Sequence, residues 1–326
     1  MSSIFDSPLY RIPNVSFWIG REDGDQPELL RWHQIIKNID LRNKADFSKA
    51  VVLLGFCCDE GVRRNMGRVG ATEGSAYLRK ALANLPVHFS FEDLHLIDGG
   101  DIICEKGDLE GAQEALSQAV SVIIDHGGFP IVLGGGHELT YGHFCGIKKS
   151  TTKTVGIINI DAHLDIRQPM DGYGSSGTGF YQIAEDLAKE NIAFHYLAIG
   201  IQQISNTKAL FNYAKHKGVQ IITAQDIYEA NVAQIITAIQ TFGKQVDVIY
   251  LTIDIDAFAA PYAPGVSALA FNGIVPDHVF NKIYATIIGL PNLISMDLAE
   301  LNPTHDIDNR TARLGADLIF KAIQQF

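Results

Sequence analysis

Short apolar runs recur along this chain and predict the strands of a sheet. Runs such as VVLLGF and VIYLTID show no alternation of apolar and polar positions. Continuous apolar strands of this kind are typical of a parallel sheet that helices cover on both faces. Eight runs rich in Val, Ile and Leu qualify as strands, at residues 51–55, 94–98, 130–133, 155–160, 195–199, 219–222, 247–253 and 292–297.

Segments with helical periodicity separate most of these runs. Because strands and helices alternate, the pattern predicts an α/β fold built on an open, mainly parallel sheet. No linker rich in Pro, Gly or Ser interrupts the alternation, so we predict a single domain over residues 49–326. Residues 1–48 have no clear pattern and are predicted to form an N-terminal arm or lead-in. The helical segments are 110–126, 181–190, 207–217, 226–242 and 277–288.

Composition and charge narrow the class of protein. No apolar run reaches the roughly 20 residues of a membrane-spanning helix, and the amino terminus lacks a secretory signal pattern, which predicts a cytoplasmic protein. The formal net charge of −11 argues against a nucleic-acid or anionic-membrane partner and leaves a small-molecule substrate. A homo-oligomer is compatible with the sequence. No C-x-x-C pair predicts a zinc knuckle or disulfide framework among the cysteines, which are Cys57, Cys58, Cys104 and Cys145.

Histidine and aspartate side chains gather at the carboxyl ends of three predicted strands, where α/β sheets bind ligands. One histidine follows three glycines, and the other side chains alternate with apolar residues, so an extended chain would point them to one side. Four clustered carboxylates repel one another unless cations offset their charge. Two divalent ions balance four carboxylates, which predicts a binuclear metal site. The six predicted ligands are His137, Asp161, His163, Asp165, Asp254 and Asp256.

The type of ligand predicts the metal and its chemistry. Carboxylate oxygens with a minority of imidazole favour Mn²⁺ over Mg²⁺ or Zn²⁺. Two neighbouring ions can lower the pKa of a water molecule and turn it into a nucleophile, which predicts hydrolysis. Each motif alone has an ordinary alternative, since DxD is common in solvated loops and a histidine after a glycine turn is often a packing residue. GGGHE is a poor phosphate loop, because no Lys-Ser/Thr follows it and the G-x-G-x-x-G spacing is absent.

Four motifs resemble, in order and spacing, those of the ureohydrolase superfamily, which comprises arginase, agmatinase and formimidoylglutamase. They are GGGHE at 134–138, DAHLD at 161–165, TIDIDAF at 252–258 and DLAELNP at 297–303. The resemblance spans residues 55 to about 320. It implies a three-layer α/β/α domain with an eight-stranded, mainly parallel sheet, and a site for two Mn²⁺ ions. It also implies that His137 and Asp165 bind one ion, that His163 and Asp256 bind the other, and that Asp161 and Asp254 bridge them.

Other segments resemble the formimidoylglutamase branch. They are DEGVRRNMGRVG at 59–70, WIGRED at 18–23 and APGVSA at 263–268. Ser176 stands where arginase and agmatinase have a histidine, as in the S-G-T-P-F motif of formimidoylglutamases, although Ser75 and Gly179 depart from the usual prolines. The resemblance implies hydrolysis of N-formimidoyl-L-glutamate to L-glutamate and formamide, a step of histidine degradation. The alternative is a guanidino hydrolase that releases urea, such as agmatinase, arginase or a guanidino-acid hydrolase.

Two further alternatives belong to other classes. A single-zinc deacetylase of related fold is disfavoured by the second carboxylate pair, Asp254 and Asp256. A metal-stabilised protein without activity is disfavoured because the ligands and Glu300 are all present.

The resemblance and the charges also predict how a substrate is held. Glu300 would pair with the amidinium group, and Asp165 would carry a proton to the departing amine. An arginine-rich loop after the first strand would take the substrate carboxylates, although the sequence does not decide which arginine does so. The predicted substrate-binding residues are Arg63, Arg64, Asn65, Arg68, Ser176, Gly177 and Glu300.

Overall fold

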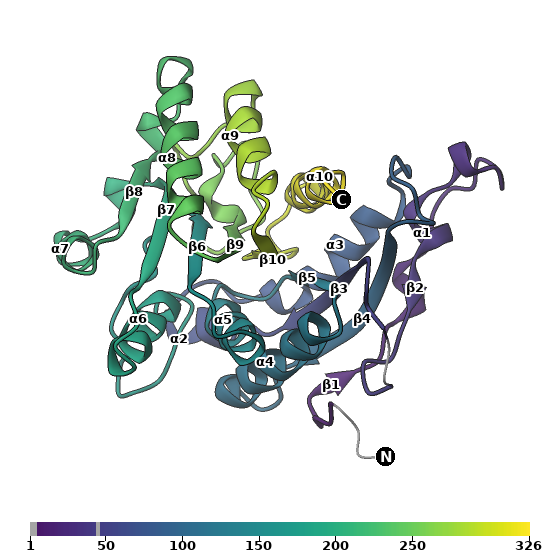
Figure 1. Ribbon diagram of the computed structural model, residues 1–326, viewed down its shortest axis with the longest axis horizontal. Helices are drawn as coiled ribbons and strands as arrows, with labels where there is room; N and C mark the ends of the chain where they lie inside the picture. Colours follow the sequence, from purple (N-terminus) through teal and green to yellow (C-terminus); the bar gives the residue numbers. More distant parts are fainter. Residues whose placement is uncertain (1–4, 44–45) are drawn as a thin grey trace.

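A computed structural model describes residues 5–43 and 46–326. Within these residues the chain forms a ten-stranded sheet with helices on both faces (Figure 1). The long strands pair parallel to one another in the order β4-β3-β5-β10-β9-β6-β7-β8. Each of the eight predicted runs overlaps one of these strands, which confirms the predicted sheet. The strands are β3 (Ala50–Cys57), β4 (His95–Ile103), β5 (Phe129–Leu133), β6 (Val155–Ile160), β7 (His195–Ile201), β8 (Gln220–Thr223), β9 (Val248–Asp254) and β10 (Leu293–Ala299).

Two layers of helices cover the sheet (Figure 1). One apolar cluster joins the first layer to alternate strand positions such as Val51 and Leu53, and a second cluster joins the other layer to Val52 and Leu54. The first layer contains α3 (Gly74–Ala83), α8 (Val232–Lys244), α9 (His278–Ile288) and α10 (Arg310–Ile323). The second contains α4 (Leu109–Asp125), α5 (Leu139–Ser150), α6 (Gly179–Lys189) and α7 (Lys208–His216). The three-layer α/β/α architecture is therefore confirmed.

All five predicted helical segments contain a helix, but one begins later than expected. The pattern predicted a helix from residue 226, whereas α8 begins at Val232. Asp226 accepts hydrogen bonds from the backbone and hydroxyl of Thr223, at 2.9 and 2.6 Å, and so closes a short 3₁₀ turn instead. Local hydrogen bonding by an Asp side chain competes with helix formation in this way.

The N-terminal segment packs along the outer edge of β4. Two short strands, β1 (Tyr10–Arg11) and β2 (Lys37–Asn38), pair with that edge in antiparallel and parallel fashion, respectively. The patterning of residues 1–48 did not predict them, and residues 1–4 and 44–45 lie outside the described part. These strands protect a sheet edge that would otherwise offer unpaired backbone groups. The division into an arm and a single domain stays a prediction.

A buried ion-pair cluster ties this segment to the sheet. Arg79 of α3 is fully buried and binds Asp98 through two hydrogen bonds of 2.9 Å and Asp101 through one of 2.7 Å. The indole of Trp18 donates to the same Asp98 carboxylate at 2.7 Å. Removing Arg79 would leave the buried charge of Asp98 and Asp101 without compensation.

The strand order brings four polar loops together. Strands β5, β10, β9 and β6 are neighbours and run parallel, so their carboxyl ends meet at one edge of the sheet. Among the described residues, no helix is both long and apolar enough to cross a membrane.

Candidate metal centre

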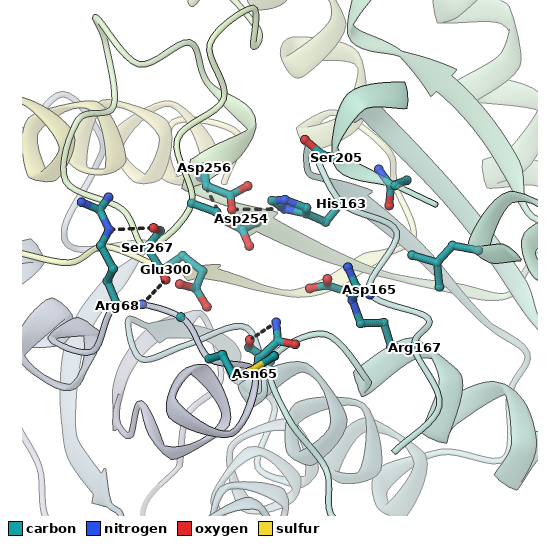
Figure 2. A pocket seen from close by; sticks show the side chains of 16 residues that line it. Asn65, Arg68, His163, Asp165, Arg167, Ser205, Asp254, Asp256, Ser267 and Glu300 are labelled. Carbon is teal, nitrogen blue, oxygen red and sulfur yellow. Dashed lines mark hydrogen bonds and ion pairs between the residues drawn. The ribbon is translucent and has the colours of Figure 1, made fainter. Parts of the chain in front are cut away.

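A cavity of about 320 Å³ opens at this edge of the sheet (Figure 2). Its volume is in the range of small-molecule sites. Four acidic side chains line it together with one histidine and two arginines. The charged lining residues are Asp165, Asp254, Asp256, Glu300, His163, Arg68 and Arg167.

The first group of candidate ligands surrounds His137. Its Nδ1 lies 2.9 Å from Asp165 Oδ2, 3.2 Å from Asp161 Oδ2 and 3.4 Å from Asp254 Oδ2. These four residues each offer one ligand atom within 4.8 Å of the others. The arrangement could hold a metal ion.

The second group surrounds His163. Its Nδ1 lies 3.2 Å from Asp256 Oδ2 and 3.5 Å from Asp161 Oδ1. Asp161 thus presents one oxygen to each group, which is the geometry that a bridging carboxylate needs. Asp254 belongs to the first group alone.

The DAHLD segment reaches this arrangement by turning. Strand β6 ends at Ile160, and the chain beyond it does not stay extended. Asp161 Oδ1 accepts the His163 N–H at 2.6 Å, and Asp165 has a left-handed φ of 47°. Asp side chains commonly hydrogen-bond the backbone two residues on and tolerate such φ values. The carboxylates that could bind metal therefore also shape the loop.

The glycines before His137 permit a tight turn. Gly134 and Gly135 have φ values of 72° and 77°. A Cβ on Gly135 would lie 2.5 Å from the carbonyl oxygen of Phe56, which real side chains do not tolerate. The turn lets the His137 N–H donate to Glu300 Oε1 at 2.8 Å.

The residues that orient the candidate ligands were not identified from the sequence. Thr252 Oγ1 lies 2.9 Å from His137 Nε2, and Asn159 donates to Asp161 Oδ2 at 3.0 Å. The sequence could have indicated Asn159, because this residue precedes Asp161 by two positions and would therefore lie on the same side of the sheet. Asn206 carries no local signal, although its side chain holds Leu164 N at 2.9 Å and Ala162 O at 2.9 Å.

The electrostatics of the cluster favour a cation. Burial disfavours a charged His137, but Asp161, Asp165 and Asp254 outweigh it and hold the His137 pKa well above its ordinary value. Carboxylates likewise hold the pKa of His163 high against its burial. Burial, Asp256 and Asp161 together raise the pKa of Asp254 well above its ordinary value.

A buried carboxylate oxygen without a hydrogen-bond partner also favours a bound cation. Asp256 Oδ1 is buried and has no hydrogen-bond partner among residues 5–43 and 46–326. A buried carboxylate oxygen without a donor is costly unless a cation meets it. The donor set therefore fits divalent metal ions.

Glu300 lies directly after β10 and faces the cavity (Figure 2). Its left-handed φ of 66° and the 2.8 Å hydrogen bond from its N–H to Gly135 O fix its backbone. Burial, with nearby Glu138 and Asp256, raises the pKa of its carboxyl well above the ordinary value. A carboxylate held in this way would gain stability from a cationic ligand.

The arginines of the predicted substrate loop have different surroundings. Arg63 pairs with Glu60 at 2.6 Å, and Arg64 pairs with Glu60 at 2.9 Å and with Glu110 at 2.6 Å. Both line a neighbouring cavity instead of the one that holds the metal cluster. Their charges are thus neutralised outside the candidate site.

Other predicted substrate residues do reach the site. Asn65, Arg68 and Ser176 line the metal cavity, and Asn65 Nδ2 donates to Ser176 Oγ at 3.2 Å. Gly177 lies beside them, since a Cβ there would be 3.3 Å from Asn65 Nδ2. Arg167 also lines the cavity and was missed, although it follows the last DAHLD ligand by only two positions.

Comparison with known proteins agrees with this geometry. The profile of the arginase family matches residues 49–324. The formimidoylglutamase of Clostridium tetani is 41% identical over 325 residues, covering 96% of this chain and 95% of the relative. That of Ralstonia nicotianae is 40% identical and covers 94% of each chain.

Solved structures are similar as well. The Trypanosoma cruzi formiminoglutamase with Mn²⁺ superposes with a TM-score of 0.74 at 27% identity, covering 86% of this chain and 93% of that one. The formimidoylglutamase of Bacillus subtilis gives a TM-score of 0.80 at 24% identity, covering 94% and 93%, and supports the fold. These matches confirm the resemblance on which the sequence interpretation rested. The chain belongs to the arginase family.

Proposed function

We propose that this protein is a binuclear manganese hydrolase that cleaves N-formimidoyl-L-glutamate to L-glutamate and formamide. The similarity to formimidoylglutamases, at 40–41% identity over at least 94% of the chain, carries the proposal. The charges of the cavity support it, because the substrate has a cationic amidine near one end and two carboxylates. Acidic residues and unpaired arginines line the same cavity.

The six clustered side chains would hold the metal ions. His137 and Asp165 would bind one ion, His163 and Asp256 would bind the other, and Asp161 would bridge them through its two oxygens. Bridging by Asp254 stays a prediction. When bound, two Mn²⁺ ions would lower the pKa of a water molecule and so supply the nucleophile at neutral pH.

Glu300 would hold the amidinium group. Its Oε1 is occupied by the His137 N–H, which fixes the carboxylate and leaves Oε2 to accept a hydrogen bond from the substrate. A charge-assisted hydrogen bond of this kind positions the amidine carbon for attack.

Asp165 would carry the proton to the departing amine. Burial and the neighbouring Asp161 raise the pKa of its carboxyl, so it accepts a proton more readily than an ordinary aspartate. Its side chain also faces the cavity, where a proton acceptor must lie.

Several general properties belong to the same proposal. The substrate is a small molecule, and nucleic acids and membranes are not partners, in keeping with the net charge of −11. The protein is cytoplasmic, and a homo-oligomer remains compatible with it.

A substrate panel tests the proposal. Manganese-loaded protein is incubated with N-formimidoyl-L-glutamate, arginine, agmatine and guanidino acids, and formamide and urea are quantified. Formamide and glutamate from the first compound are expected. Release of urea from a guanidino compound without turnover of formimidoylglutamate would contradict the proposal.

A further inference from the structure

The cavity contains two arginines whose charges no carboxylate neutralises. Arg68 and Arg167 both line it, and no ion pair joins either of them to an acidic residue in the described part of the chain. Figure 2 shows them on opposite sides of the cavity, with Glu300 and Asp165 between them. The two arginine side chains differ in their hydrogen bonds, which indicates different roles.

Arg68 is engaged with the backbone. Its Nε donates to Ser267 O at 2.9 Å and its Nη2 donates to Val266 O at 2.6 Å. Its own N–H donates to Ser267 Oγ at 2.8 Å. Arg68 thus ties its loop to segment 266–267, and these bonds fix the direction of its guanidinium.

Arg167 has a free guanidinium. Within residues 5–43 and 46–326, no hydrogen bond or ion pair involves its side chain, which is exposed. All five N–H donors are therefore available to a ligand. A guanidinium presents them in a planar fork that matches the two oxygens of a carboxylate.

The backbone of Arg167 is held in place. Its N–H donates to Gly177 O at 2.9 Å, and the Asp165 carbonyl accepts from Phe180 N at 3.2 Å. Ile166 between them is buried. These two hydrogen bonds hold together the two segments that contain Arg167 and Gly177, so the backbone from which the Arg167 side chain extends is fixed.

Small neutral residues lie beside the Arg167 side chain, which also lines the neighbouring cavity together with Arg63 and Arg64. A Cβ on Gly177 would lie 3.2 Å from Arg167 Cδ, so the glycine leaves the side chain its room. Asn65 and Ser176, joined by a 3.2 Å hydrogen bond, line the same cavity and can donate to an anion without competing for the cation. Arg63 and Arg64, in contrast, are already paired with glutamates.

We propose that Arg167 binds a carboxylate of the substrate and so selects amidines that carry an acidic group. The inference deepens the proposed function and rests on it for the identity of the substrate. The cation would attract a carboxylate and repel the basic tail of a guanidino substrate such as agmatine. Acidic specificity then comes from the loop that also supplies three candidate metal ligands.

Kinetics of two Arg167 variants test this role. Arg167→Gln removes the charge, Arg167→Lys keeps it without the planar fork, and Arg313→Gln is the control. Arg313 is exposed on α10, its side chain has no partner among the described residues, and it does not line the cavity. KM and kcat for formamide release are measured with manganese-loaded protein.

We expect Arg167→Gln to raise KM for formimidoylglutamate roughly 10- to 100-fold, as for loss of a charged hydrogen-bond partner. The contact forms equally in the ground and transition states, so kcat should stay within about threefold. Arg167→Lys should restore part of the loss, and Arg313→Gln should match the wild type. An unchanged KM in Arg167→Gln would overturn the inference.

Binding of L-glutamate gives a readout that does not depend on turnover. Calorimetry on the manganese-loaded protein should show weaker glutamate binding to Arg167→Gln than to the wild type, and equal binding would overturn the inference. If the wild type released urea from a guanidino compound and no formamide, the proposed function would fail. The glutamate comparison would still decide the role of Arg167.

Discussion

Thr252→Val is the substitution that most sharply tests how the site is built. Thr252 is fully buried, and its hydroxyl lies 2.9 Å from His137 Nε2 while His137 Nδ1 faces the carboxylates. Valine keeps the shape of the side chain and removes the hydroxyl. The buried Nε2–H of His137 would then lack an acceptor, and the imidazole would lose the contact that fixes its orientation.

The expected effect follows from that lost contact. A buried donor left without a partner costs about 1–3 kcal/mol. Outer partners of metal-bound histidines are worth roughly 10- to 100-fold in metal affinity, which corresponds to about 1.4–2.7 kcal/mol. We therefore expect the Mn²⁺ affinity of Thr252→Val to fall by about 10- to 100-fold.

The assay is calorimetric titration of the metal-free protein with Mn²⁺. Ser117→Ala is a suitable control, because it also removes a buried hydroxyl, but one that has no hydrogen-bond partner in the described structure. Its Mn²⁺ affinity should equal that of the wild type. If Thr252→Val bound Mn²⁺ as tightly as this control, the proposed orientation of His137 would be wrong.

Three further predictions concern protons, buried charge and the glycine turn. Carboxylates hold the pKa values of His137 and His163 high in the metal-free protein, whereas Mn²⁺ needs neutral imidazoles. Mn²⁺ binding should therefore release protons and become stronger as the pH rises. Calorimetric titration in buffers of different ionisation enthalpy measures the proton release, and its absence would contradict this prediction. Arg79→Met leaves Asp98 and Asp101 buried without their cation and should lower the free energy of unfolding in urea by about 3–5 kcal/mol, whereas a loss below about 1 kcal/mol would refute the role of the cluster. Gly135→Ala should destabilise the protein more than Gly218→Ala. Both glycines have left-handed φ values near 75°, but only at Gly135 would a Cβ collide with a backbone atom, the carbonyl oxygen of Phe56. Equal decreases in the melting temperature of the two variants would contradict this prediction.

Local patterns were enough to predict the sheet and the metal cluster. Strand β9, for example, begins with an apolar run, and its last residue, Asp254, is one of the predicted ligands. Both features are local in sequence, and the parallel order then brings strand ends together. The exact path of the loops was harder to predict, because the side chains of Asp161 and Asp254 bend the chain by accepting the backbone N–H groups of the residues two positions further on.

Contacts between distant segments could not be read from the sequence. Arg64 looked available for substrate, but it pairs with Glu110, 46 positions away. Asn206 holds the DAHLD loop from another part of the chain without any motif of its own. Such pairings depend on the packing of the fold, whereas patterns along the chain report only on neighbours.

The most direct test of the account is formamide release from N-formimidoyl-L-glutamate as Mn²⁺ is added stepwise to metal-free protein. The account predicts that the rate rises until two ions are bound per chain and that formamide is the product. A plateau at one ion per chain, or no formamide at any metal content, would contradict it.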